Sequence, residues 1–369
     1  MALLGAGQAP IGLDIGKSSI VGVQVSGRSP NFVLKGYAER ALPEGIMFEG
    51  EVVDPVALAN ELKAFMKDAR MKGKVVNLGV GNQKVIVRQI EVPEMGEEEL
   101  RGAIEFQAQD YIPIPIEEAV LDFQVVNRYA GDDGVGKQQV LLVAAQKDMV
   151  NKFLEAADKA GIKVAGIDVN AFALIRALAT PVAFIDQGGQ AARTLGVVNI
   201  SSAVSTLVVA VDGVPKFTRI INFTNDAFTR LLVERQGILP EDALALMERV
   251  GLPGPVAPDS ATYNPVTIDE VHASLGSVAE ELAEEIRRSL DYYQSQDYAA
   301  YADHLYLTGR GALLLNLDSY LSEFLGIRVE RGNPLLKLVQ NGSGVPDEVL
   351  ASLAPCLAIA VGLALDEVD

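Results

Sequence analysis

The chain has 369 residues, of which 49% are hydrophobic and 22% charged, as expected of a folded protein with two domains or one large two-lobed domain. Its 31 basic and 49 acidic side chains give a net charge of −18, which argues against nonspecific binding to nucleic acid or anionic lipid, because phosphate-rich surfaces require clustered cations. One cysteine and two histidines exclude an intramolecular disulfide and a metal site built from several His and Cys ligands.

The two ends of the chain carry no expected export or membrane segment. Met1–Pro10 has no cationic start and no long apolar run, so we expect no signal peptide. No eighteen successive residues are apolar, which predicts no membrane-spanning helix. The acidic end Leu365–Asp369 lacks the basic and large apolar residues of an amphipathic anchor, so direct membrane insertion is not expected.

The first ninety residues are predicted to form strands and one helix. Residues 11–15 and 19–25 are rich in β-branched side chains and flank the turn Gly16–Ser18, which predicts a hairpin. Apolar residues spaced three and four apart predict a helix over 56–71. Further strands are predicted at 32–38, 75–80 and 85–92.

A small α+β block follows. Acidic residues crowd the first turn of a predicted helix at 97–111, where they suit the helix dipole. Pro113 and Pro115 bias their predecessors toward extended geometry, so the segment Tyr111–Ile116 must leave the helix. The block is completed by predicted strands at 119–129 and 138–145, a helix at 147–160 and a strand at 163–169.

The second half of the chain repeats the opening strand–turn–strand unit after a predicted linker at Gln187–Gln190. Val197–Ala203 resembles Leu13–Ser18 in layout, which indicates a weak internal duplication. Strands are predicted at 206–211, 216–222 and 304–308. Helices are predicted at 224–236, 240–250, 267–296, 313–325 and 354–365.

The turn after Asp14 has the composition of a phosphate-binding loop. A glycine at position 16 admits a phosphate close to the backbone, and the amides of Gly16, Lys17, Ser18 and Ser19 can form an anion-binding nest. Asp14 would hold a hydrated magnesium ion. An ordinary β-hairpin with a glycine turn is the alternative interpretation of the same residues.

Two further segments are typical of a binding site for a purine nucleotide. Gly309, Arg310, Gly311 and Ala312 follow a predicted strand, and the glycine pair would let an adenine lie against the backbone. Glu284, Arg287 and Arg288 share one face of a predicted helix and would grip a ribose and a purine. A solvated charged surface is the alternative for these three side chains.

In this order the segments resemble those of the superfamily of actin, the heat-shock chaperones and hexokinase. At family level the chain is similar to PilM, the cytoplasmic actin-like proteins of type IV pilus assembly. The resemblance runs nearly from end to end, and the proline-containing segment after the acidic helix discriminates most, because generic actin-like ATPases lack it. The resemblance is carried by Gly12–Gly16, Pro43–Gly45, Gly50–Pro55, Val92–Met95, Glu105–Pro115 and Ala360–Leu365.

The resemblance implies an α/β, actin-like fold of two duplicated, ribonuclease H-like lobes with a nucleotide cleft and an inserted α+β subdomain named 1C. The implied subdomains are 1A at 1–87 and 169–192, 1C at 88–168, 2A at 193–225 and 293–345, 2B at 226–292, and a C-terminal helix at 346–369 that returns to 1A.

The resemblance also implies a cytoplasmic scaffold of a pilus or related secretion machine. Such a protein binds ATP with Mg²⁺ between its lobes. It is recruited to the inner face of the membrane by the N-terminal cytoplasmic peptide of a PilN-like inner-membrane protein, and self-association is left open. We expect Phe106, Tyr111, Ile112 and Ile114 to line the peptide groove between 1A and 1C. Packing of the 1A/1C junction is the alternative for these side chains.

The sequence departs from the family pattern at the second phosphate loop. The family usually has Asp-Ile-Gly there, and this chain has Asn199, Ile200 and Ser201, followed by Ser202. An amide cannot supply the negative charge that orients a magnesium-bound water, and a serine side chain stands where close backbone approach is wanted. We therefore expect Asn199, Ser201 and Ser202 to contact nucleotide with weak or no hydrolysis, and we predict no catalytic residue. Arg310 is a milder departure.

Three alternatives remain for the function. An active ATPase switch would use hydrolysis to change partner affinity, and the second phosphate loop argues against it. A sugar or small-molecule kinase of the same superfamily would need a catalytic base beside the sugar, and no acid outside the nucleotide loops can be assigned that role. An FtsA-like membrane-associated polymer is disfavoured by the acidic C-terminal end.

Overall fold

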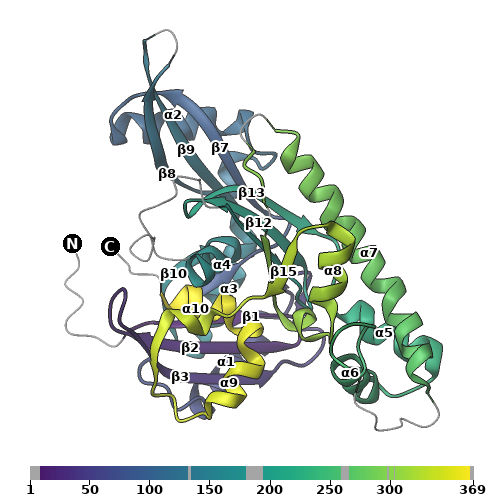
Figure 1. The fold of residues 1–369 in the computed structure, drawn as a ribbon. Helices are drawn as coiled ribbons and strands as arrows, with labels where there is room; N and C mark the ends of the chain where they lie inside the picture. The colour runs from purple at the N-terminus through teal and green to yellow at the C-terminus, as the bar shows by residue number, and fades with distance from the viewer. Residues whose placement is uncertain are drawn as a thin grey trace.

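Two mixed sheets that share the order of five strands form the two lobes of the computed structural model (Figure 1). The structure describes residues 9–131, 134–179, 194–258, 266–296, 299–302 and 304–365, so the expected linker Gln187–Gln190 lies outside the described residues. The first sheet has the order β10-β6-β1-β2-β3-β16 and consists of β1 (Ile11–Ile15), β2 (Ser19–Ser26), β3 (Phe32–Ala41), β6 (Val75–Val80), β10 (Lys163–Val169) and β16 (Leu338–Asn341).

The second sheet repeats five strands of this arrangement. It has the order β13-β12-β11-β14-β15 and consists of β11 (Thr194–Asn199), β12 (Ser205–Val211), β13 (Val214–Ile221), β14 (His304–Thr308) and β15 (Arg328–Arg331). Strands β11, β12, β13, β14 and β15 take the places of β1, β2, β3, β6 and β10, and β16 has no counterpart. In each sheet the first strand pairs antiparallel with the next strand along the chain and parallel with a strand that arrives much later. The internal duplication predicted from Val197–Ala203 is therefore confirmed at the level of strand order.

Helices α1 (Pro55–Asp68) and α3 (Lys147–Ala160) pack together beside the first sheet, and a small hairpin of β4 (Met47–Phe48) and β5 (Glu51–Val52) lies next to them. Helix α1 starts at Asp54, whose Oδ1 accepts hydrogen bonds from the amides of Val56 and Ala57, both at 2.9 Å. Helix α3 ends at Gly161, which has a φ of 70° and so suits glycine.

Helices α4 (Asn170–Leu178) and α10 (Ala358–Ala364) lie between the two sheets, and α9 (Asp347–Leu353) precedes α10 (Figure 1). A Cβ on Gly362 would lie 1.9 Å from the Ala173 carbonyl oxygen, so these two helices touch through their backbones. An apolar cluster joins the lobes here and includes Leu174, Ile175, Val197, Val208, Ile359 and Leu363.

The run Asp347–Ala364 is the one helical stretch, within the described residues, that is long and apolar enough to cross a membrane by length and composition. All of α10 is buried in the protein, so the apolar character of this part of the stretch is that of a core helix, whereas only Leu350 of α9 is buried.

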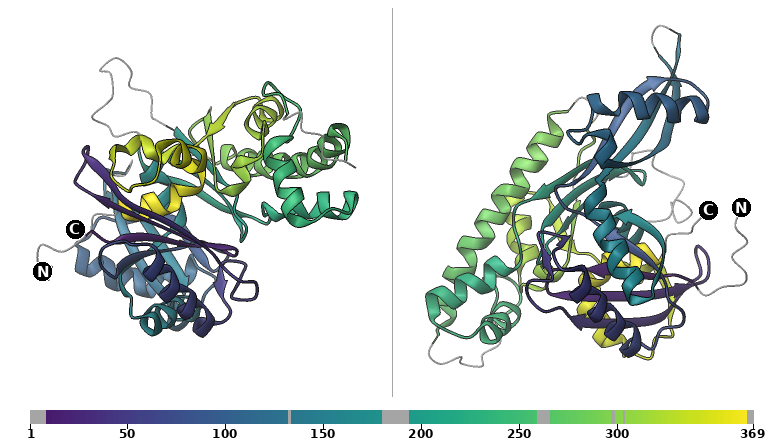
Figure 2. Two further views of the ribbon diagram at one scale, coloured as in Figure 1. Left: turned by 90° about the horizontal axis from the view of Figure 1, so that it is seen from below. Right: turned by 180° about the vertical axis from the view of Figure 1, so that it is seen from behind.

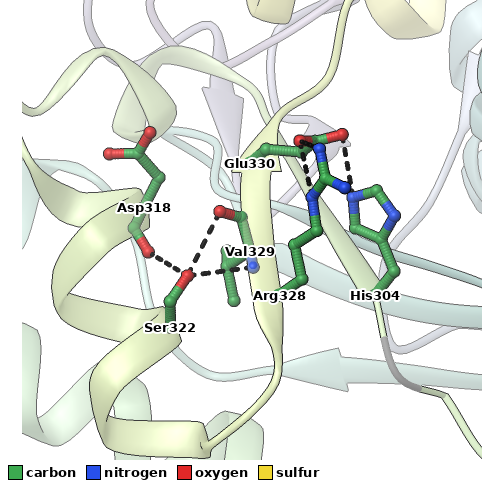
Figure 3. A network of polar contacts seen from close by, with 6 residues as sticks. All are labelled: His304, Asp318, Ser322, Arg328, Val329 and Glu330. Atoms are coloured by element: carbon green, nitrogen blue, oxygen red, sulfur yellow. Dashed lines mark hydrogen bonds and ion pairs between the residues drawn. The ribbon is translucent and has the colours of Figure 1, made fainter.

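The second lobe carries α5 (Asp226–Gln236), α6 (Pro240–Arg249), α7 (Ile268–Gln294) and α8 (Leu317–Leu325). Figure 2 shows α7 running along the outer side of this lobe. Thr267 starts α7 with a capping box, in which its hydroxyl accepts from the Glu270 amide and Glu270 accepts from the Thr267 amide. Ser322 of α8 fixes the sheet edge, since its Oγ accepts from the Val329 amide at 2.9 Å and donates to the Asp318 carbonyl at 2.8 Å (Figure 3).

A three-stranded antiparallel module projects from the first lobe (Figure 2). It has the order β7-β9-β8, with β7 (Val85–Pro93), β8 (Ala119–Ala130) and β9 (Gly136–Gln146), and α2 (Glu97–Gln107) packs on it. The sequence places this module at 88–168, but β10 pairs with β6 in the first sheet and α3 packs against α1. The described module therefore extends only from β7 to β9.

Candidate functional site

Three loops meet at one cavity between the lobes. They are the turn between β1 and β2, the turn between β11 and β12, and the 3₁₀ turn Arg310–Leu313 after β14. The cavity measures about 50 Å³ and is lined by Asp14, Gly16, Ser18, Ser19, Val21, Asn199, Ser201, Ser202, Gly309, Arg310, Cys356 and Ile359. Nine of the residues predicted to bind nucleotide are thus brought together, from segments far apart in the sequence.

The two glycines of the third loop are required by packing against the second loop. Gly309 has a φ of +79°, and a Cβ on it would lie 2.4 Å from the Ile200 carbonyl oxygen. A Cβ on Gly311 would lie 2.3 Å from Ile200 Cγ2, and the Gly311 amide donates to the Ile200 carbonyl at 3.0 Å. Ala312 beside them is fully buried. These residues were predicted to leave room for an adenine, and here they hold two loops of the cleft in contact.

The first loop differs from a simple anion-binding nest. The Gly16 amide donates to the Ser19 carbonyl at 2.9 Å, so it closes the turn on itself. Lys17 reaches across the cleft and pairs with Asp226 of α5 at 2.8 Å. The Ser18 hydroxyl donates to the Ser202 hydroxyl at 3.2 Å, so the first and second loops touch.

Asp14 carries the most perturbed carboxyl group of the cleft. Burial disfavours its ionised form and raises its pKa to about 7. None of the described residues donates a hydrogen bond to its side chain. The donor set fits Mg²⁺, which proteins often hold through one or two carboxylates together with substrate phosphates. Within the described part of the chain no cluster of three or more Asp, Glu, His or Cys residues offers a cage for a metal on its own.

Asn199 and Ser201 have structural roles in the second loop. Asn199 is 5% exposed, and its Oδ1 accepts a hydrogen bond from the Thr308 hydroxyl. Ser201 Oγ donates to the Val204 carbonyl at 2.7 Å and accepts from the Ala203 amide at 3.2 Å. Each side chain therefore stabilises the loop in which it lies.

The three polar residues of α7 do not line the cleft cavity formed by the described residues. Arg287 pairs with Glu284 and lies over the Phe324 ring of α8, 4.9 Å from its centroid. Arg288 pairs with Glu285 one turn earlier. Their expected contact with a ribose and a purine stays a prediction.

The residues predicted to line a peptide groove lie on the module and differ in exposure. Phe106 is 85% exposed and Tyr111 is 37% exposed, whereas Ile114 is half-buried. Ile112 is only 5% exposed and belongs to the module core with Leu100 and Ile104. The expectation that Ile112 presents its side chain to a peptide is therefore wrong, because this side chain is needed to pack α2 onto the sheet.

A larger cavity lies where the module, the first lobe and the second lobe meet. It measures about 250 Å³ and is lined by Gly81, Asn82, Gln83, Val85, Ile86, Val87, Arg88, Val169, Asn170, Ala171, Thr206, Thr218, Arg219 and Ile220. We call it the three-way groove. Asn170 Oδ1 is buried with no hydrogen-bond partner in the described residues. Sequence reasoning missed this site because four separate segments form it; the nearest local signal is the pair Gly79 and Gly81, whose added Cβ atoms would collide with Asn170.

Two comparisons with known proteins, one with family models and one with solved structures, both lead to PilM. A family model described as type IV pilus assembly protein PilM matches residues 12–368. A chain from a solved PilM-PilN type IV pilus biogenesis complex is similar with 29% identity and a TM-score of 0.80, covering 97% of this chain and 99% of that one. Two more distant structures share the fold. One is the ethanolamine utilization protein EutJ from Carboxydothermus hydrogenoformans (14% identity, 97% and 90% covered, TM-score 0.53). The other is MreB 5 of Spiroplasma citri bound to AMPPNP (11% identity, 96% and 94% covered, TM-score 0.52).

Proposed function

The chain belongs to the family of type IV pilus assembly proteins PilM, and on that premise we propose that it is an actin-like scaffold at the cytoplasmic face of the inner membrane. In this role it binds ATP with Mg²⁺ in the interlobe cleft with little or no hydrolysis. It also binds the N-terminal cytoplasmic peptide of a PilN-like inner-membrane protein.

The meeting of the three loops at one cavity supports the nucleotide part of the proposal. Asp14 would hold Mg²⁺ through water, and the bound ion would neutralise phosphate charge. The amides of Lys17 and Ser18 and the hydroxyls of Ser18 and Ser202 would face the phosphates. The MreB 5 structure contains AMPPNP, and at 11% identity it supports the shared fold alone.

The three-way groove is the observation that carries the partner part of the proposal. A cavity of about 250 Å³ with apolar walls from Val85, Val87 and Ile220 accommodates a few side chains of an extended peptide. Asn170 and Thr206 add polar groups to this lining, which suits the alternation of apolar and polar groups along a peptide. The complex of the 29% identical relative contains PilN, which supports the choice of partner.

Two binding measurements test the proposal. Mg²⁺–ATP should raise the melting temperature, because a ligand that binds only the folded state stabilises it by mass action. Gly16→Val should remove this shift by filling the space beside the first loop. The matched control is Gly102→Val, at a position where an added Cβ meets no atom within 4 Å. No shift of the parent protein at millimolar ATP would leave a scaffold that works without nucleotide.

The partner is tested with a fluorescent peptide that carries the N-terminal residues of a PilN-like inner-membrane protein from the same organism. We expect saturable binding by fluorescence anisotropy, and no binding to a scrambled peptide. Equal binding of both peptides would refute the partner assignment. An active ATPase switch is the second candidate function. The hydrogen bond from the Thr308 hydroxyl to Asn199 gives Asn199 a structural role, which favours the passive scaffold.

A further inference from the structure

Two ion pairs join the lobes across the mouth of the cleft. Arg310 of the third loop pairs with Glu39 of β3, and Lys17 of the first loop pairs with Asp226 of α5. The Lys17 and Asp226 side chains are 41% and 36% exposed, so this pair contributes little. Arg310 and Glu39 are 35% and 22% exposed, and this pair is the more shielded of the two.

Both oxygens of the Glu39 carboxylate are engaged. Oε1 accepts from Arg310, and Oε2 accepts from the Tyr37 hydroxyl at 3.1 Å. Burial, together with the adjacent Glu39 charge, raises the pKa of Tyr37, so its hydroxyl remains a donor at all ordinary pH values. Glu39 is therefore held in place by its own strand before Arg310 reaches it from the other lobe.

The cleft cavity beside these contacts is too small for a nucleotide in this state. Its volume is about 50 Å³, whereas sites for small-molecule ligands and cofactors have roughly 300–1,000 Å³. Arg310 itself lines the cavity. In the described state, the loops proposed to bind ATP thus leave less room than a nucleotide needs.

We propose that the Arg310–Glu39 pair is a latch between the lobes, which must open before a nucleotide triphosphate enters the cleft and which frees the Arg310 guanidinium to meet the phosphates. The inference rests on the proposed function, because it assigns a regulation to the same cleft. The apolar cluster around Leu174, Val208 and Ile359 joins the lobes independently of the latch and keeps them together when it opens.

The test compares Glu39→Gln with Glu61→Gln. Glu61 also pairs with an arginine, Arg40, and the two side chains are 22% and 34% exposed, but both belong to the first lobe. The variants therefore remove the same charge from pairs of matched exposure, and only Glu39 spans the cleft. Hydrogen exchange of peptides covering 12–20 and 305–313 reports opening without nucleotide. Stopped-flow fluorescence with methylanthraniloyl-ATP and Mg²⁺ measures the rate at which the labelled nucleotide enters the cleft.

We expect Glu39→Gln to exchange faster in both peptides and to bind the labelled ATP about five-fold faster than the parent, the effect of losing a partly shielded ion pair. Glu61→Gln should stay within about two-fold of the parent. Equal exchange in the two variants, or faster exchange with unchanged association, would overturn the latch. Faster exchange in Glu39→Gln with no labelled ATP bound by any variant would uphold the latch and instead refute ATP binding.

Discussion

The Asn199 amide oxygen accepts a hydrogen bond from the Thr308 hydroxyl at 3.0 Å and so joins the ends of β11 and β14 beneath the cleft. Both residues are almost completely buried. The Ile200 amide adds a second bond to the Thr308 carbonyl at 2.8 Å. The side chain at position 199 is thus committed to holding two strands together, and it carries no charge toward the cavity that it lines.

This relationship predicts a slow or undetectable ATPase. Phosphoryl transfer depends almost entirely on positioning and electrostatics, and the second loop supplies no carboxylate. Replacing Asn199 with Asp retains an acceptor for Thr308 and adds the charge, while Ser201→Gly opens the loop. We expect the double variant to hydrolyse ATP at least ten-fold faster than the parent in a phosphate-release assay. A parent protein that already turns over at about 1 per second, a typical enzyme rate, would contradict the prediction.

Asp14 predicts a pH dependence of stability. Its pKa in the folded protein is about 7, well above the roughly 3.9 of an unfolded aspartate. The folded state therefore binds the proton more tightly, and stability should fall as the pH rises from about 4 to 7. Asp14→Asn removes this loss, so its melting temperature relative to the parent should be higher at pH 8 than at pH 5. Parallel melting curves across this range would show that Asp14 is not the group responsible.

The same carboxyl group makes nucleotide binding depend on pH. Mg²⁺ requires the ionised carboxylate, so binding of Mg²⁺–ATP must release a proton when Asp14 is protonated beforehand. We expect the ATP-induced shift of the melting temperature to be larger at pH 8 than at pH 6. Calorimetry in two buffers of different ionisation enthalpy counts the released proton directly. Release of no proton at pH 6 would exclude Asp14 from the site.

The contact between α10 and α4 predicts a large effect of one methyl group. A Cβ at position 362 would lie 1.9 Å from a backbone oxygen of α4, which cannot move without shifting the helix. Gly362→Ala should lower the free energy of unfolding by about 3 kcal/mol, the upper part of the range for overpacked cores. Gly276→Ala in α7, where an added Cβ meets nothing within 4 Å, should raise it by about 0.5–1 kcal/mol. Urea denaturation followed by circular dichroism measures both, and similar values for the two variants would show that α10 adjusts freely.

Sequence patterns predicted those helices and strands that carry clear local signals within their own residues. The predicted bounds of β6, β10, β14 and α3 match the observed ones, because β-branched runs and a C-terminal glycine are sufficient signals. Helix α4 was missed because it has only nine residues, most of them apolar, and a short apolar run of this length can also form a buried strand. Strand β16 was missed because it pairs with β3 from the opposite end of the chain.

The candidate site likewise has features that the local sequence predicted and features that depend on contacts between distant segments. The three cleft loops were found because each follows a strand and contains glycine or serine in a recognisable order. The Arg310–Glu39 pair was not found, because nothing in the local sequence relates positions 39 and 310. At the module, the prolines correctly predicted that the chain leaves α2, but packing decides that Ile112 faces inward while Ile114 is half-buried.

Ile114 and Ile220 distinguish two positions for the partner peptide. Ile114 belongs to the segment predicted from the sequence, and Ile220 of β13 lines the three-way groove. Each is half-buried and neither belongs to an apolar core cluster of the described residues, so an aspartate at either position should leave the fold intact. If the groove holds the peptide, Ile220→Asp should weaken binding at least ten-fold by fluorescence anisotropy, because it buries a charge against apolar side chains. Ile114→Asp should bind as the parent does, with circular dichroism confirming that both variants are folded. The reverse result would move the peptide to the outer face of the module, and normal binding by both variants would exclude both positions.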